Sequence, residues 1–214
     1  MEQDKTRLYL IRHGVTEWNK GGRYQGWTDI ALSKEGEEQA ELLAKRFEYM
    51  PLDAIYASPL QRAIATAAPI AKAKGMELKV EEAFKEINFG EWEGHTVAEL
   101  NEKYGQPYMD FFNDPFNHDM PGEGSFRNAA KRVMEGYERI VEAHRGERVA
   151  IVSHGGLLRV FLVTLLGLDM KMYRGMWLTN TSISMVDIMP NDEKFLMTLN
   201  DKAHLELADL IRSR

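Results

Sequence analysis

The sequence predicts an α/β fold, namely a three-layer sandwich with a mainly parallel central sheet and helices on both faces. Short apolar segments at residues 7–11, 53–57 and 148–152 alternate with longer segments in which apolar residues recur at helical spacing. Strands that alternate with helices form parallel sheets that are buried on both faces. The composition, 44% hydrophobic and 28% charged, is that of a globular chain with a large core.

The N-terminal half predicts three strands and two helices. The first helix has Ser33 as its expected N-cap, and Pro51 closes it. The second helix has Ser58-Pro59 at its start, with the serine as cap and the proline at the first helical position. The expected elements are a strand at 7–11, a helix at 34–50, a strand at 53–57, a helix at 59–74 and a weaker strand at 78–81.

The C-terminal half predicts a long irregular region followed by further strands and helices. Residues 106–124 contain three prolines among Asp, Asn and Gly, and we interpret a segment at about 95–124 as an insertion or lid. The whole chain, 1–214, is expected to form one domain. The expected elements are an irregular loop at 86–94, a helix at 125–144, a strand at 148–152, an apolar helix at 157–168, and strands at 182–188 and 194–200.

Two expected strands end in a histidine followed by glycine. Arg12-His13-Gly14 follows the first strand, and Ser153-His154-Gly155-Gly156 follows the strand at 148–152. In open parallel sheets, polar ligands bind beyond the carboxyl ends of the strands. The two histidines therefore mark a candidate site.

Composition and charge exclude several kinds of partner. The formal net charge is −6, which argues against a broad basic surface for nucleic acid or anionic lipid and favours a small-molecule partner. The chain has no cysteine, so disulfides, thiol nucleophiles and thiolate metal sites are absent. The remaining histidines lack metal-ligand spacing, so we expect no metal and no cofactor. They are His95, His118, His144 and His204.

The sequence predicts a cytoplasmic protein. Residues 1–6 are polar and of mixed charge, without the apolar stretch of a secretory signal. The apolar run at 157–168 is interrupted by Arg159 and falls far short of the roughly 20 residues that span a bilayer. Oligomeric state stays open, because an apolar patch on an exposed edge cannot be recognised from sequence.

Four motifs then identify a family. They are residues 12–40, with Arg12-His13-Gly14 and Asn19; residues 58–67, with Arg62; Glu86 with residues 89–94; and residues 153–156, with His154. In this order, they resemble the histidine phosphatase superfamily, which includes the cofactor-dependent phosphoglycerate mutases. The pattern is closest to the short bacterial phosphatases of the broad-specificity, α-ribazole and phosphoserine phosphatase types. The resemblance extends from residue 8 to about residue 200.

The resemblance implies a phosphohistidine mechanism. His13 matches the family's nucleophile, whose ring nitrogen attacks phosphorus in line with the leaving oxygen. Arg12 and Arg62 match the phosphate clamp, and their positive charge would lower the pKa of His13 and keep the imidazole neutral. Arg62 also falls in the first turn of its expected helix, which favours an anion. His154 matches the second histidine, a hydrogen-bond donor to the transferring phosphoryl group.

The resemblance also implies an acid and several binding residues. Glu86 matches the residue that protonates the leaving alkoxide and then takes a proton from the attacking water. The remaining implied substrate-binding residues are Asn19, Gln25, Gly26 and Gly155.

We expect a metal-independent phosphomonoester hydrolase. The alternatives are a phosphoglycerate mutase and a catalytically silent module that binds phosphorylated ligands. The interval from Glu86 to His154 is shorter than in most mutases of this kind, which favours hydrolysis, and retention of all five proposed catalytic residues argues against the silent module. The motifs concern only the binding of the phosphate group. We expect residues 106–124 and 177–182 to determine which substrate is bound.

Overall fold

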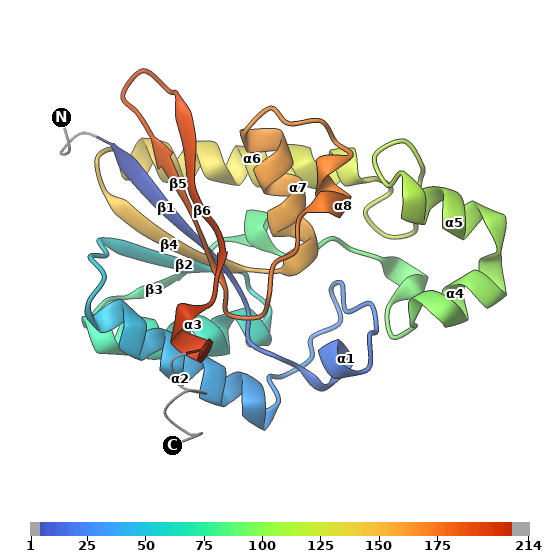
Figure 1. Cartoon of the computed structure of the whole chain (residues 1–214), viewed down its shortest axis with the longest axis horizontal. Helices are drawn as coiled ribbons and strands as arrows, with labels where there is room; N and C mark the ends of the chain where they lie inside the picture. Colours follow the sequence, from blue (N-terminus) through green and yellow to red (C-terminus); the bar gives the residue numbers. More distant parts are fainter. Residues whose placement is uncertain (1–4, 207–214) are drawn as a thin grey trace.

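The structure is a computed structural model that describes residues 5–206, and it confirms the α/β fold (Figure 1). The strands of this part of the chain form one mixed sheet in the order β3-β2-β4-β1-β5-β6. Their bounds are β1 Thr6–Arg12, β2 Ala54–Ala57, β3 Leu78–Val80, β4 Arg148–Ser153, β5 Ile183–Ile188 and β6 Lys194–Asp201. The first four are mutually parallel, and β5 and β6 are antiparallel to their neighbours.

Helices cover both faces of the sheet, as predicted (Figure 1). Side chains of β1 alternate between the faces: Leu8 and Leu10 enter one core, and Tyr9 and Ile11 enter the other. The core around Leu8 is covered by α6 (Phe126–Ala143) and α7 (Gly155–Leu165). The core around Tyr9 is covered by α2 (Lys34–Glu48) and α3 (Gln61–Lys74). This two-sided burial gives the three layers.

Shorter helices lie around this sandwich. The pair α4 and α5 lies at the end of the molecule farthest from β6 (Figure 1). The pair joins the core through aromatic contacts, with Trp92 packed against Tyr108 and Phe111 at 5.2 and 4.8 Å between ring centroids. The remaining elements are α1 Glu17–Lys20, the 3-10 helices η1 Glu82–Phe84 and η2 Gly90–Trp92, α4 Val97–Tyr104, α5 Gln106–Asn113 and α8 Met172–Gly175.

The expectation that all of residues 106–124 are irregular was wrong for its first part. Helix α5 occupies Gln106–Asn113, with Pro107 in its first turn. Proline is tolerated there because the first N–H groups of a helix have no intrahelical acceptor. Turns follow only from Asp114 onward.

The predicted cap of α3 was also wrong. The N-cap residue is Leu60, and the helix begins at Gln61, two residues later than expected. The hydroxyl of Ser58 instead lies 2.7 Å from Nε2 of His154. Ser58, which the sequence pattern indicates as a helix cap, therefore belongs to the site. Arg62 remains in the first turn of α3, as predicted.

No helix within residues 5–206 is long and apolar enough to cross a membrane. The expectation of a cytoplasmic location rests on residues 1–6, of which the first four lie outside the described part of the chain. That expectation stays a prediction.

Candidate active site

The register of three neighbouring strands brings the two predicted histidines together. Arg12 pairs with Ser153 across β1 and β4, and Ala57 of β2 pairs with Val152 of β4. The residues that follow these strand ends therefore leave the sheet side by side. The rings of His13 and His154 lie 5.1 Å apart between centroids, and both are almost fully buried.

His13 presents one ring nitrogen to the site. Its Nδ1 lies 2.7 Å from the carbonyl oxygen of Gly14, which can only accept a hydrogen bond. The hydrogen of the neutral ring therefore sits on Nδ1, and Nε2 keeps its lone pair. Burial, together with the charges of Arg62 and Arg12, holds the pKa of His13 well below its ordinary value of 6.5. The geometry thus provides the neutral imidazole that attack on phosphorus requires.

Arg62 is fully buried and links three parts of the site. Its Nη2 and Nη1 groups donate to the carbonyl oxygens of Gly26 and Thr28 at 2.7 and 2.9 Å, and its Nε donates to Nδ1 of His154 at 3.2 Å. Gly26 has φ +50°, and a Cβ on it would overlap the side chain of Glu93. The glycine is therefore required for the loop to pass this close to the guanidinium.

Arg12 is a cation with unused hydrogen-bonding capacity. Its Nη1 donates to the carbonyl of Leu178 at 2.7 Å, whereas its buried Nε has no partner among the described residues. Burial lowers the pKa of Arg12 to about 10, so the group remains charged near neutral pH. A buried N–H without an acceptor is costly, and an anionic oxygen would satisfy it.

His154 is held by protein groups on both ring nitrogens. Because Nδ1 accepts from Arg62, the hydrogen of the neutral ring lies on Nε2 and is donated to Ser58 Oγ at 2.7 Å. Burial and the nearby charge of Arg62 lower the pKa of His154 well below 6.5. A bond from this histidine to a phosphoryl group would have to replace the bond to Ser58, so its donor role stays a prediction.

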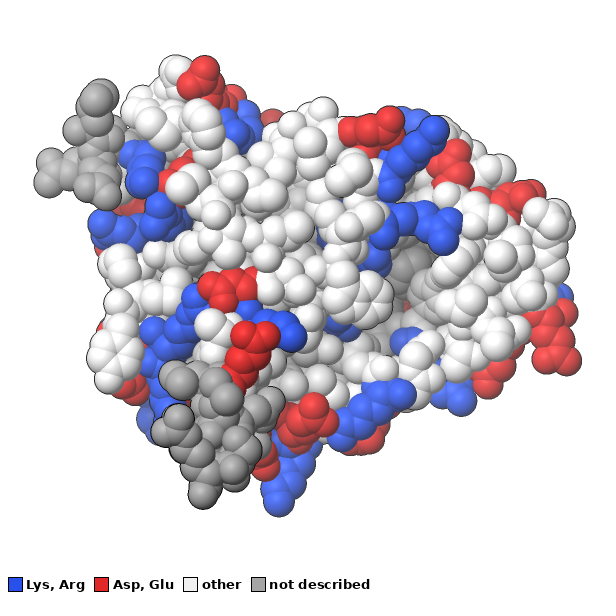
Figure 2. All heavy atoms as spheres, in the orientation of Figure 1, with Lys and Arg blue, Asp and Glu red and all other residues white. Residues whose placement is uncertain are grey.

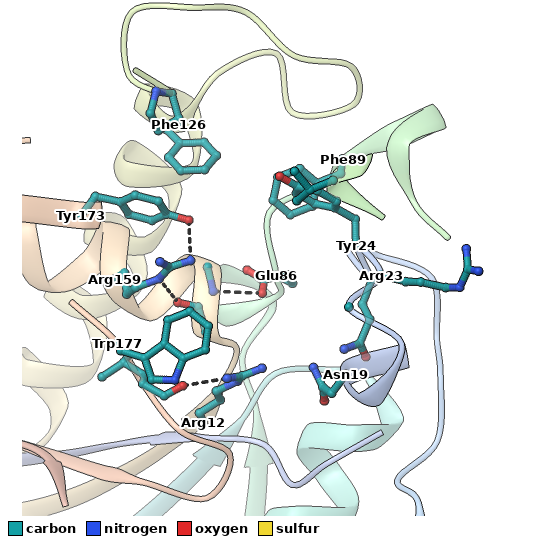
Figure 3. Close-up of a pocket in the computed structure, with 18 of the residues that line it drawn as sticks. Arg12, Asn19, Arg23, Tyr24, Glu86, Phe89, Phe126, Arg159, Tyr173 and Trp177 are labelled. Atoms are coloured by element: carbon teal, nitrogen blue, oxygen red, sulfur yellow. Dashed lines mark hydrogen bonds between the residues drawn. The ribbon is translucent and has the colours of Figure 1, made fainter. Parts of the chain in front are cut away.

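The carboxyl group of Glu86 lies against the N-terminus of α7 (Figure 3). Its Oε1 accepts from the backbone N–H of Leu157 and Ile87 at 2.8 and 2.9 Å, and its Oε2 accepts from Gly156 at 3.2 Å. These donors orient the carboxyl group in the pocket that also contains His13 and Arg62. Neighbouring Glu93 has a different task, because it accepts from the backbone N–H groups of Trp27, Thr28 and Phe89 and so shapes the loop.

All four predicted binding residues line the same pocket. Oδ1 of Asn19 accepts from the backbone N–H of Thr16, and Oε1 of Gln25 accepts from the hydroxyl of Thr16. Gly155 stands against Arg12, where a Cβ would come within 3.0 Å of Nε. The structure therefore brings the predicted site residues together, with His154 bonded to Arg62 but not among the residues that line the pocket.

The pocket has a volume of about 470 Å³ and opens on the face seen in Figure 2, where Lys and Arg side chains border the hollow. Trp177 lines this pocket, whereas Trp92 packs in the aromatic core.

The sequence did not predict much of the pocket wall that lies opposite the strand ends. The residues it missed include Arg23, Tyr24, Phe89, Phe126, Arg159, Tyr173 and Arg174. The one available signal was Arg159, a charge in an otherwise apolar helix.

Within residues 5–206, no group of three or more His, Asp or Glu side chains is arranged to hold a metal ion.

Comparison with known proteins agrees with this geometry. The family model of the histidine phosphatase superfamily (branch 1) matches residues 8–202. Phosphoserine phosphatase 1 of Hydrogenobacter thermophilus is 36% identical over 199 residues, which cover 93% of this chain and 94% of the relative. A metal-independent phosphoserine phosphatase of Arabidopsis thaliana is 36% identical over 210 residues, which cover 96% and 85%.

Among solved structures, a phosphoserine phosphatase from Entamoeba histolytica, in complex with 3-phosphoglyceric acid, superimposes with a TM-score of 0.85. Its sequence is 34% identical, and the match covers 94% of this chain and 99% of that one. The likeness therefore extends over most of both chains.

Proposed function

Because this chain belongs to branch 1 of the histidine phosphatase superfamily and is a phosphatase of small phosphorylated metabolites, we propose that it works through a phosphohistidine on His13. One observation carries the assignment. Nδ1 of His13 is bound to the Gly14 carbonyl, so the free Nε2 faces a pocket that also holds Arg12 and Arg62.

In the first step, the phosphate ester binds with its anionic oxygens against the two guanidinium groups. Nε2 of His13 attacks phosphorus, the N–P bond forms, and the bond from phosphorus to the ester oxygen breaks. Glu86 in its acid form gives a proton to the leaving oxygen, which departs as an alcohol.

In the second step, water attacks the phosphohistidine. Glu86, now a carboxylate, takes the water proton, the N–P bond breaks, and inorganic phosphate leaves. Arg12 and Arg62 stabilise the charge on the phosphoryl group throughout, and His154 joins them once its Nε2–H exchanges Ser58 for a phosphoryl oxygen.

Phosphoserine is the substrate that we propose first. Two relatives named above are phosphoserine phosphatases, and both match more than 90% of this chain. The pocket is large enough for a small phosphorylated acid, at about 470 Å³. The segment interpreted as a lid supports this role, because Phe111, Phe112 and Pro115 from α5 and the turn after it line the pocket. The cytoplasmic location and the single-domain layout remain part of this proposal.

The test is a phosphate-release screen over metabolite monoesters with wild type and His13→Ala. Release by wild type alone, with phosphoserine among the best substrates, is the expected result. Equal inactivity of both proteins toward every ester would instead support the phospho-ligand binding module. Efficient isomerisation of 3-phosphoglycerate without phosphate release would support the mutase, which the phosphatase relatives do not favour.

A further inference from the structure

The pocket contains more positive charge than one phosphate requires. Arg12 and Arg62 stand beside His13, and Arg159 and Arg174 line the same pocket. Within residues 5–206, neither Arg159 nor Arg174 makes an ion pair with a carboxylate. Among the described residues that line the pocket, Glu86 is the only one with a carboxylate. A ligand with a single anionic group would leave this excess uncompensated.

Arg159 is held in a fixed position with one donor group to spare. Its Nε donates to the carbonyl of Gly155 at 3.1 Å, and its Nη2 donates to the hydroxyl of Tyr173 at 2.8 Å. Its guanidinium also stacks over the Tyr173 ring, 4.1 Å from the centroid. Among the described residues, no acceptor binds Nη1. Figure 3 shows the guanidinium on the α7 side of the pocket, between Tyr173 and Trp177.

Arg159 reaches the pocket from α7, one helical turn after Gly155, and its charge helps to lower the pKa of Arg12. Arg12 and Arg62 flank the nucleophile, whereas Arg159 is not among the charges that lower the pKa of His13. A guanidinium fixed by stacking suits a planar carboxylate, because it loses little freedom when the ion pair forms. Arg174, exposed at the mouth, adds positive charge on the same side.

We propose that Arg159 binds the carboxylate of the substrate and thereby selects phosphorylated carboxylic acids over phosphate esters that lack an acid group. This assignment rests on the proposed function, because it places the phosphate of the same ligand against His13. Arg159 is a specificity determinant and takes no part in the transfer of the phosphoryl group.

The experiment compares two pairs of esters that differ by one carboxylate. Phosphoserine is paired with phosphoethanolamine, and 3-phosphoglycerate with glycerol 3-phosphate. We expect Arg159→Met to lower kcat/KM for the two acids on the order of 10- to 100-fold, chiefly through KM, and to change the other two esters less than about threefold. Arg159→Lys restores part of the preference, because it keeps the charge without the planar fork.

Two further variants separate recognition from support of the fold. Tyr173→Phe removes the hydroxyl but keeps the stacked ring, so it should retain most of the preference. Arg145→Met removes an exposed arginine, ion-paired to Glu142 and outside this pocket, and should change none of the four rates. An equal loss toward all four esters in Arg159→Met would overturn the proposal.

Calorimetric binding makes the result independent of turnover. In the His13→Ala background, phosphoserine should bind more tightly than phosphoethanolamine, and adding Arg159→Met should abolish that difference. If this difference is absent from the start, Arg159 is not a carboxylate ligand. If it is present while wild type releases no phosphate from any ester, the hydrolase assignment fails and the carboxylate assignment stands.

Discussion

At the scale of the residue, the site depends on groups whose hydrogen bonds fix their protonation state. The Gly14 carbonyl fixes the tautomer of His13, and Arg62 fixes that of His154. Arg62 uses its Nε for His154, and its Nη1 and Nη2 donate to the carbonyls of Thr28 and Gly26. A single ammonium group could not reach all three acceptors, since they surround a planar fork.

We therefore expect Arg62→Lys to lower kcat by about 100-fold or more, because one phosphate ligand and the orientation of His154 are lost together. Steady-state hydrolysis of p-nitrophenyl phosphate measures the effect. Arg148→Lys is the matched control, because its ion pair to Asp53 is exposed and distant from the pocket. A loss of less than tenfold in Arg62→Lys would mean that charge alone suffices at this position.

At the scale of the element, helix α6 positions the loop that carries Glu86. Arg132 of α6 donates to the carbonyl oxygens of Ala83, Lys85 and Glu86 at 2.9, 2.7 and 3.2 Å, and it pairs with Glu123 at 2.8 Å. Trp27 donates from its indole to the same Glu86 carbonyl at 2.7 Å. The backbone of the proposed acid is thus fixed from two sides by elements distant in sequence.

Arg132→Met should misplace Glu86 and lower kcat by roughly 10- to 100-fold with a smaller change in KM. Arg139→Met, on the same helix and paired with Glu81, is the control and should leave kcat unchanged. The pH profile of kcat distinguishes a misplaced Glu86 from a simple loss of protein stability, because only a misplaced acid shifts the profile. An unchanged profile in a folded Arg132→Met protein would contradict this role.

Sequence patterns predicted the elements whose local signals are strong. The apolar strands before His13 and His154, and the helix with Ser33 as N-cap, lie where they were expected. Ser58 was misread because its position before a helix is a capping signal, while its partner His154 is 96 residues away. Arg132 gave no such signal, and Arg159 gave only that of a charge in an apolar helix, because the direction in which a helical arginine points depends on tertiary packing.

At the scale of the whole molecule, buried histidines couple folding to pH. Burial lowers the pKa of His13 and His154 well below 6.5, and it lowers that of His204 to about 4. In the unfolded chain, each would titrate near 6.5. Below that pH the unfolded chain binds more protons than the folded one, so protonation favours unfolding.

Stability should therefore fall as the pH drops from about 7 to about 5, by up to about 1.4 kcal/mol per pH unit for each histidine that stays neutral when folded. Urea unfolding at the two pH values measures the change. His204→Gln should remove the contribution of one histidine to this pH dependence of the free energy of unfolding. Substitution of the exposed His118 by Gln should not alter the pH dependence. Equal stability at both pH values would contradict the burial of neutral imidazoles.

The central claim, that His13 carries the phosphoryl group, is tested most directly by trapping the intermediate. Rapid denaturation in alkali during turnover of a labelled phosphate ester, followed by peptide mapping, locates the phosphoryl group, because phosphohistidine survives alkali and is lost in acid. We predict an acid-labile phosphoryl group on the peptide that contains His13, and none on the same peptide from His13→Ala. Turnover with no phosphorylated protein, or with the label on another residue, would contradict the account.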